Sequence, residues 1–188
     1  METDRKTRIA DAAIALLGHA GAKGLTHRAV DAEAGLPVGS TSFYFRTRHD
    51  LLTLALMRHA ALDLADLQAD AQRMRRANWG VEDFIDLLIH RVADWLSPGK
   101  RARLVARFEL FLVAYHEAEL ADIVTQQRQR FVAATELALT NAGLRDAARL
   151  APMLLALVDG VLLDQICAKG PALSDAQQRA MFRAVLAG

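Results

Sequence analysis

Residues 38–48 combine four small hydroxyl side chains, three aromatic rings and two arginines in a run that holds no acidic residue. Ser40, Thr41 and Ser42 add little bulk, so this backbone can approach a nucleic-acid groove closely. Their hydroxyl groups suit phosphate oxygens and base edges alike. Arg46 and Arg48 stand at the predicted start of a helix, where backbone N–H groups, the helix dipole and guanidinium groups all favour a phosphate. These residue types predict a DNA-binding surface.

The candidate contacts fall into two groups. Those expected to position phosphates are Thr26, His27, Arg28, Arg46 and Arg48. Those expected at the major groove are Val38, Ser40, Thr41, Phe43 and Tyr44, and Ser42 and Thr47 complete the set. Short hydroxyl side chains read bases ambiguously, so the sequence of the DNA site does not follow from them.

Two short helices and a turn must position these side chains. Thr26 is suited to cap the first helix, and Gly35 to end it cheaply. Pro37 fits the first turn of a second helix over residues 38–44, because its missing N–H has no helical partner there. Thr47 and Asp50 have the spacing of a capping box that opens a third helix. The pattern predicts a helix-turn-helix.

The wording of this stretch resembles the DNA-binding domain of TetR-family transcriptional regulators over roughly residues 5 to 55. The matching positions are Ala34 and Gly35 at the helix-turn, Gly39 opening the recognition helix, Phe45 as hydrophobic plug, and Leu51 and Leu52 in the next helix. Arg48 stands where the family usually has a phosphate-contacting lysine. Ser42 departs from the family's common tyrosine, and we expect Tyr44 to supply that contact instead.

The resemblance implies an all-α homodimer with about nine helices. We expect a helix-turn-helix head over residues 1–47 and a helical ligand-binding and dimerisation domain over residues 48–188. Such a protein is most often a repressor that binds a palindromic, double-stranded operator and is released by a small, largely apolar ligand. No cofactor is expected.

Composition agrees with this interpretation. Of 188 residues, 53% are hydrophobic but only 6% aromatic, a balance typical of a helical protein with an apolar interface. The net charge of +1, and seven basic against six acidic residues in 1–52, predict modest, dimer-dependent DNA affinity. A single Cys167 and no visible signal peptide favour the cytoplasm, and the apolar run of residues 151–158 is too short to span a bilayer.

Apolar periodicity predicts seven further helical segments around the helix-turn-helix. Their expected ranges are residues 4–19, 48–75, 81–96, one after a turn at 97–99, 118–141, 150–167 and 176–186. Ser174 and Gln177 have the spacing of a capping box before the last helix. The helix over 150–167 is apolar nearly all round, so we expect one side to face its own bundle and the other a partner subunit.

A ligand pocket and a dimer interface are expected in the C-terminal part. The pocket candidates are the aromatic residues Trp95, Phe108, Phe111 and Tyr115, with Glu109, His116 and Gln165 as orienting polar groups. Plain core packing is the alternative for each of them. The dimerisation candidates are Leu154, Leu157, Val158, Val161, Leu162, Phe182 and Val185.

Two other classes of function stay open from the residues alone. One is a helical dimeric interaction module with a helix-turn-helix fold that no longer reads DNA, which the near-neutral head permits. The other is an α-helical enzyme that uses the aromatic pocket, but Leu120 replaces the second histidine of a metalloprotease motif, and no nucleophile motif is present. Asp86, His90 and Asp94 share a helix face, yet they are a poorly specific metal set, so we expect neither enzyme nor metal.

Overall fold

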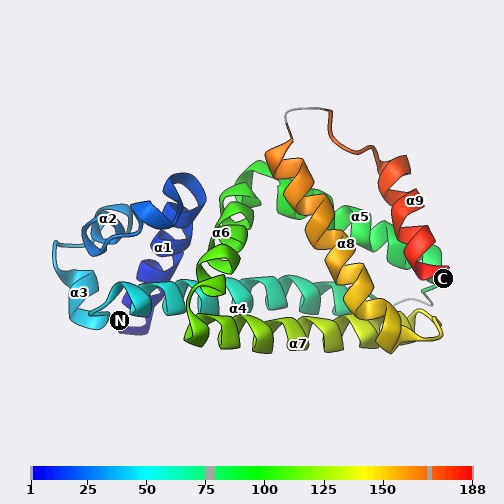
Figure 1. Ribbon diagram of the computed structural model, residues 1–188, viewed down its shortest axis with the longest axis horizontal. Helices are drawn as coiled ribbons and strands as arrows, with labels where there is room; N and C mark the ends of the chain where they lie inside the picture. Colours follow the sequence, from blue (N-terminus) through cyan, green and yellow to red (C-terminus); the bar gives the residue numbers. More distant parts are fainter. Residues whose placement is uncertain (1, 75–78, 169–170, 188) are drawn as a thin grey trace. The chain divides into compact units, whose positions relative to one another are not determined.

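The computed structural model describes residues 2–74, 79–168 and 171–187, and within these ranges it contains nine α-helices and no strand (Figure 1). The helices are α1 (Glu2–Gly24), α2 (His27–Glu33), α3 (Ser40–Tyr44), α4 (Arg48–Met74), α5 (Val81–Leu96), α6 (Pro98–Tyr115), α7 (Ala118–Asn141), α8 (Ala147–Cys167) and α9 (Asp175–Leu186). The all-α fold class predicted from the sequence is confirmed.

The chain divides into two compact units. The first unit comprises Met1–Asp63 and Pro98–Gln127, and the second comprises Leu64–Ser97 and Arg128–Gly188. The long helices α4 and α7 each contribute residues to both. The division by packing therefore differs from the functional boundary at residue 47, which stays a prediction.

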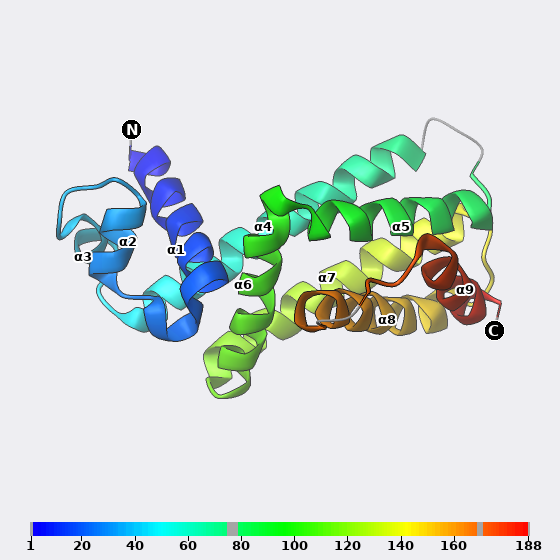
Figure 2. The same ribbon diagram turned by 90° about the horizontal axis from the view of Figure 1, so that it is seen from above.

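The first unit is built on the packing of α1 against α6, with α2 beside α1 (Figure 2). Gly18 lies at the crossing, where a Cβ atom in its place would stand only 2.2 Å from the carbonyl oxygen of Ala102 on α6. Gly21 adopts a φ of 64°, which kinks α1 before a last turn that runs on to Gly24. Glu109 of α6 accepts a hydrogen bond from the Ala22 amide at 2.9 Å and so satisfies an N–H group freed by the kink.

Most helix ends lie where the sequence predicted them. The bounds of α5 and α7 agree with the predicted ranges, and Gly143, with a φ of 79°, follows the end of α7. The Ser174 capping box forms as predicted at the start of α9. Several expectations differ: α1 extends beyond residues 4–19 at both ends, α3 begins at Ser40, α6 begins already at Pro98, and α8 begins at Ala147. The expected end of α4 at residue 75 lies outside the described residues.

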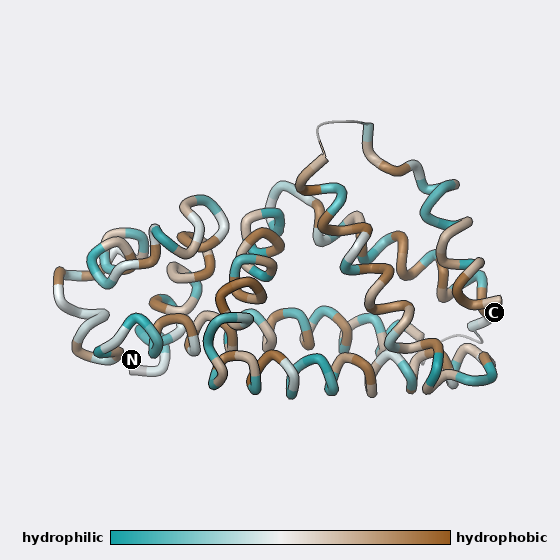
Figure 3. Tube along the Cα trace, in the orientation of Figure 1, coloured by the Kyte–Doolittle hydropathy of each residue, from teal (hydrophilic) through white to brown (hydrophobic). Residues whose placement is uncertain are grey.

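The second unit packs α8 and α9 against α5. Figure 3 shows α8 as a largely apolar helix, and its buried side chains include Leu150, Leu154, Val158 and Leu162. By length and composition alone α8 would be long enough to cross a membrane, contrary to the expectation from the shorter run at residues 151–158. Its buried stripe instead packs inside the second unit.

Candidate nucleic-acid interface and ligand cavity

The turn between α2 and α3 is held by one buried carboxylate. Asp31 of α2 accepts hydrogen bonds from the backbone amides of Gly39 and Thr41, both at 2.7 Å. These amides belong to the first turn of α3, which has no capping side chain of its own. Asp31 therefore serves as a long-range N-cap for the recognition helix.

Asp31 is ionised in this setting. Burial raises the pKa of its carboxyl group, but the hydrogen bonds from Thr41 and Gly39, together with the nearby His27, outweigh burial and lower the pKa. The sequence analysis missed this residue, because a cap eight residues away from its helix leaves no local spacing signal.

The recognition helix is shorter than predicted. Gly39 adopts a φ of 90°, so α3 begins at Ser40 rather than at residue 38, and Val38 lies in the turn before it. A left-handed backbone at residue 39 favours glycine, which has no Cβ atom to strain it. The shortening leaves Val38 84% exposed, in front of the helix.

Thr41 is removed from the candidate groove contacts. Its side chain is fully buried behind α3, next to the Asp31 carboxylate that binds its own amide. A buried side chain in this capped turn cannot reach a base edge. Sequence spacing alone placed it with its exposed neighbour Ser42 on the outward face.

The outward face of this motif carries exposed apolar groups. Phe43 is 78% exposed, and its ring meets the half-buried Tyr44 edge to face, with the centroids 5.1 Å apart. The ammonium group of Lys6 on α1 lies 5.7 Å from the centroid of Tyr44. Phe43 therefore stands on a ring that α1 supports.

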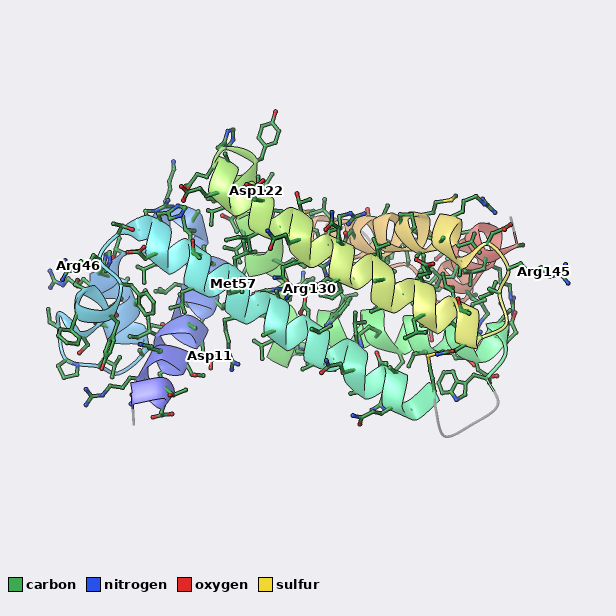
Figure 4. The ribbon with its side chains drawn as sticks, turned by 90° about the horizontal axis from the view of Figure 1, so that it is seen from below. Asp11, Arg46, Met57, Asp122, Arg130 and Arg145 are labelled. Atoms are coloured by element: carbon green, nitrogen blue, oxygen red, sulfur yellow. The ribbon has the colours of Figure 1, made fainter. Side chains whose placement is uncertain are left out.

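The predicted phosphate-positioning residues Thr26, Arg28 and Arg46 are exposed, and Thr26 also caps α2 by accepting from the Ala29 amide. Figure 4 shows Arg46 on the side of the first unit that carries α3. His27 is half-buried, and its Nε2 atom lies 2.8 Å from the carbonyl oxygen of Phe45. His27 thus ties α2 to the segment after α3.

The start of α4 forms the predicted capping box. The Thr47 hydroxyl accepts from the Asp50 amide at 3.0 Å, while the Asp50 carboxylate accepts from the amides of Arg46 and Thr47. The exposed Arg48 donates to the carbonyl oxygen of Ala22 on α1 at 2.8 Å. Arg48 therefore helps to hold the head together, and its predicted phosphate contact would have to compete with this bond.

The second unit contains a cavity of about 300 Å³ between α4, α5 and α7. Its lining is mostly apolar and includes Leu67, Phe84, Leu88 and Ala134. Asp70 and Arg91 supply its charged groups. A volume at the lower end of the range for ligand pockets suits a small molecule.

Arg91 forms a cluster of ion pairs beside the cavity. Its guanidinium group donates two hydrogen bonds of 2.7 Å to the carboxylate of Asp70 and also pairs with Asp94. Burial lowers the pKa of Arg91, but the hydrogen bonds and charges of Asp70, Asp66 and Asp94 outweigh burial and raise the pKa. This fixed fork holds α5 to α4 beside the cavity.

The seven residues predicted to form a ligand pocket lie elsewhere. None of them lines this cavity. They divide between the two units: Trp95 and Gln165 belong to the second, and Phe108, Glu109, Phe111, Tyr115 and His116 to the first.

Several of these seven have other partners. Trp95 donates to Asp66, and Glu109 caps the kinked end of α1. Tyr115, 84% exposed, packs edge to face on the exposed His116. Their proposed role as one pocket therefore gains no support from the arrangement within either unit.

The predicted dimerisation residues are mostly core. The members buried within their own chain are Leu154, Val158, Val161, Leu162 and Phe182, while Leu157 and Val185 are half-buried. Because α8 is apolar nearly all round, its periodicity did not reveal which side faces inward. The outward stripe of α8 instead carries Met153 and Leu163, 45% and 43% exposed.

A known protein family and several solved structures match this chain. The family described as "Tetracyclin repressor-like, C-terminal domain" matches residues 79–188. No curated protein is similar enough to count as a relative.

Solved structures match over almost the whole chain. The multidrug binding protein EbrR, solved in complex with ethidium, is 28% identical with a TM-score of 0.74, over 97% of this chain and 98% of EbrR. A TetR-family member from Streptomyces coelicolor A3 is 27% identical with a TM-score of 0.75, over 97% of this chain and 98% of its own.

A third structure, a regulator from Saccharomonospora viridis in complex with choline, shares the fold at 18% identity and a TM-score of 0.78, over 97% of this chain and 95% of its own. The family match over more than half of the chain, joined to the capped helix-turn-helix, shows that the chain belongs to the TetR family of transcriptional regulators.

Proposed function

We propose that the protein is a transcriptional repressor that binds a palindromic operator as a homodimer and is released by a small, largely apolar ligand. The observation that carries this proposal is the head surface, where α3 is capped by Asp31 and presents exposed side chains without any acidic residue from 38 to 48. A recognition helix fixed in this way loses little entropy on entering a major groove. The cytoplasm is the compartment, and no enzymatic activity belongs to the proposal.

Dimerisation would use the outward face of α8. Met153, Leu157, Gly160 and Leu163 recur at three- and four-residue spacing along the helix, which is the pattern of one stripe. Outside the backbone of α8 itself, no group of the described residues lies within 4 Å of a Cβ position at Gly160, so a partner helix has room to approach there. A two-fold dimer would present two heads about 34–36 Å apart, one turn of B-DNA.

The effector site is assigned to the cavity between α4, α5 and α7. Its apolar lining and its small volume suit a compact, largely apolar molecule. The 28% identical EbrR was solved with ethidium, which supports a small-molecule site in this fold.

Coupling between effector and operator would run through α4. This helix supplies Leu64–Met74 to the second unit, while its first turn directly follows the helix-turn-helix and belongs to the first unit. A ligand that prefers a position of α4 different from the one in the operator complex lowers operator affinity. By linkage, the operator then lowers ligand affinity by the same factor.

The test of DNA binding is Arg28→Ala, because Arg28 is exposed on α2 and is predicted to contact a phosphate rather than a base. We expect weaker binding to specific and non-specific DNA alike, with a salt dependence lower by about one phosphate contact. Affinity measured by fluorescence anisotropy at matched salt checks this. Unaltered affinity for both DNAs would contradict the placement of α2.

A further inference from the structure

We propose that Val38 and Phe43 read thymine methyl groups, so that the preferred operator carries thymine opposite these two side chains. The inference rests on the proposed DNA-binding function. It assigns sequence specificity to the two apolar side chains of the head surface rather than to its hydroxyl groups.

Exposure is the first argument. Val38, in the turn before α3, and Phe43, within α3, are 84% and 78% exposed, and Ser42, which lies between them in the sequence, is exposed as well. Two apolar side chains that are this exposed contribute none of the stabilisation that their burial would bring. A partner surface that covers both of them recovers it.

The chemistry of the major groove identifies the complementary group. Valine and phenylalanine carry no hydrogen-bonding atoms, so they cannot distinguish the donors and acceptors on base edges. The C5 methyl group of thymine is the alkyl group that unmodified DNA presents in the major groove. Contact with this methyl group is therefore the sequence-reading interaction that these two side chains can make.

The backbone that carries the two side chains is also held in place before DNA binds. Asp31 fixes the amides of Gly39 and Thr41. Val38 directly precedes the first of these residues, and Phe43 follows the second by two positions. Phe43 further rests edge to face on Tyr44. Fixed apolar groups of this kind discriminate better than flexible ones, since less conformational freedom is lost on contact.

Space in front of the turn completes the argument. Among the described residues, apart from its two chain neighbours, no group lies within 4 Å of a Cβ atom added to Gly39. The backbone between Val38 and Ser40 is thus free to come close to a base edge, which methyl contact at van der Waals distance requires.

The experiment has two stages, both with the full chain. First, duplexes that the wild-type protein retains are selected from a randomised DNA library. Second, the selected duplex is remade with 2′-deoxyuridine in place of each thymidine in turn, which removes one methyl group and no hydrogen-bonding atom.

We expect at least two positions in each half-site at which 2′-deoxyuridine lowers affinity about fourfold, which is the effect of losing the burial of one methyl group. Val38→Ala and Phe43→Ala should each abolish this sensitivity at a different position. The matched control is Leu112→Ala, which truncates a 68% exposed apolar side chain on α6 of the same unit and should keep both sensitivities.

The outcomes separate the two proposals. A library from which no sequence is enriched overturns the DNA-binding function itself and favours a protein-docking role for the head. The methyl reading is overturned if 2′-deoxyuridine leaves the affinity for an enriched sequence unchanged. It is also overturned if both alanine variants keep the sensitivity to 2′-deoxyuridine. In either case the DNA-binding function stands. Circular dichroism of each variant confirms that the helical fold is retained.

Discussion

At the residue scale, one carboxylate decides the geometry of the DNA-binding head. Asp31 is buried and binds two amides of α3 that have no other cap. A five-residue helix is too short to be stable by propensity alone, so its orientation depends on such external hydrogen bonds.

Asp31→Ala is expected to lower the free energy of unfolding by about 1–3 kcal/mol, because the buried Thr41 amide and the part-buried Gly39 amide lose their acceptor. Operator affinity should fall as well, since α3 loses its fixed orientation. Urea denaturation followed by circular dichroism gives the first value and anisotropy the second. The control is Glu33→Ala, an exposed change on the same helix, which should stay within about 0.5 kcal/mol of wild type. An equally small effect of Asp31→Ala would contradict the capping role.

His49 provides a second residue-scale prediction, for pH. Its Nδ1 and Nε2 atoms lie 3.0 Å from the carboxylates of Glu117 and Glu119 respectively. The hydrogen bond with Glu117 raises the pKa of His49, burial opposes this rise, and the charges of Glu119, Glu117 and Asp50 add to it. The protonated imidazole therefore ties the start of α4 to the start of α7.

Because the folded pKa lies above the ordinary value of 6.5, this stabilisation is complete below pH 6.5 and is lost as pH rises through the folded pKa. His49→Gln should accordingly melt below wild type at about pH 6, with the difference shrinking towards about pH 8. Thermal melts of both proteins over this range measure the difference. A gap that stays constant with pH would show that the charge of His49 is not involved.

At the element scale, the crossing of α1 and α6 is the most demanding contact in the first unit. Gly18→Ala would place a methyl group 2.2 Å from the Ala102 carbonyl oxygen, a distance that requires backbone movement. We expect a loss of about 1–3 kcal/mol in unfolding free energy, as for other overpacked sites.

Gly99→Ala is the matched control, since a Cβ atom there would meet no group within 4 Å in the described part of the chain beyond the local backbone of α6. This glycine lies in α6 itself, so the exchange should be neutral or slightly stabilising. Equal effects of the two substitutions, measured by chemical denaturation, would argue against close packing at Gly18.

The same elements show what a sequence reveals and what it does not. The bounds of α5 and α7 and the capping boxes at Thr47 and Ser174 follow from signals within a few residues, and they were predictable. The Asp31 cap joins residues eight to ten apart, and the bonds from Arg8 to the carbonyl oxygens of Ala34 and Gly35 span more than twenty-five residues. Neither leaves a periodic trace in the sequence.

The misplaced sites have a related cause. Helix α8 is apolar on all sides, so its periodicity could not separate the buried Leu154 from the outward Leu163. Likewise, the ligand pocket was predicted at the aromatic residues of α6. The cavity is instead lined largely by leucines and alanines, which resemble ordinary core residues.

At the scale of the whole molecule, the proposed function requires that ligand binding in one unit alters the other. The cavity can be tested by itself with ethidium as probe, in the absence of DNA. Ala134→Phe inserts a ring among the cavity-lining side chains, and Ala133→Phe adds the same ring at an exposed position of α7. We expect the first change to weaken ethidium binding about tenfold or more and the second to leave it unaltered, as measured by ethidium fluorescence. Identical affinities for the two variants would exclude the cavity as the ethidium site.

The most direct test of the account is the specificity of the intact protein for DNA. Purified protein is titrated by fluorescence anisotropy against DNA from its own upstream intergenic region and against a shuffled sequence, at several salt concentrations. The account predicts a preference for the native DNA of about a thousandfold or more, with affinity that falls steeply as salt rises. Equal and weak binding to both DNAs at every salt concentration, together with an absence of enrichment from the randomised library, would contradict it.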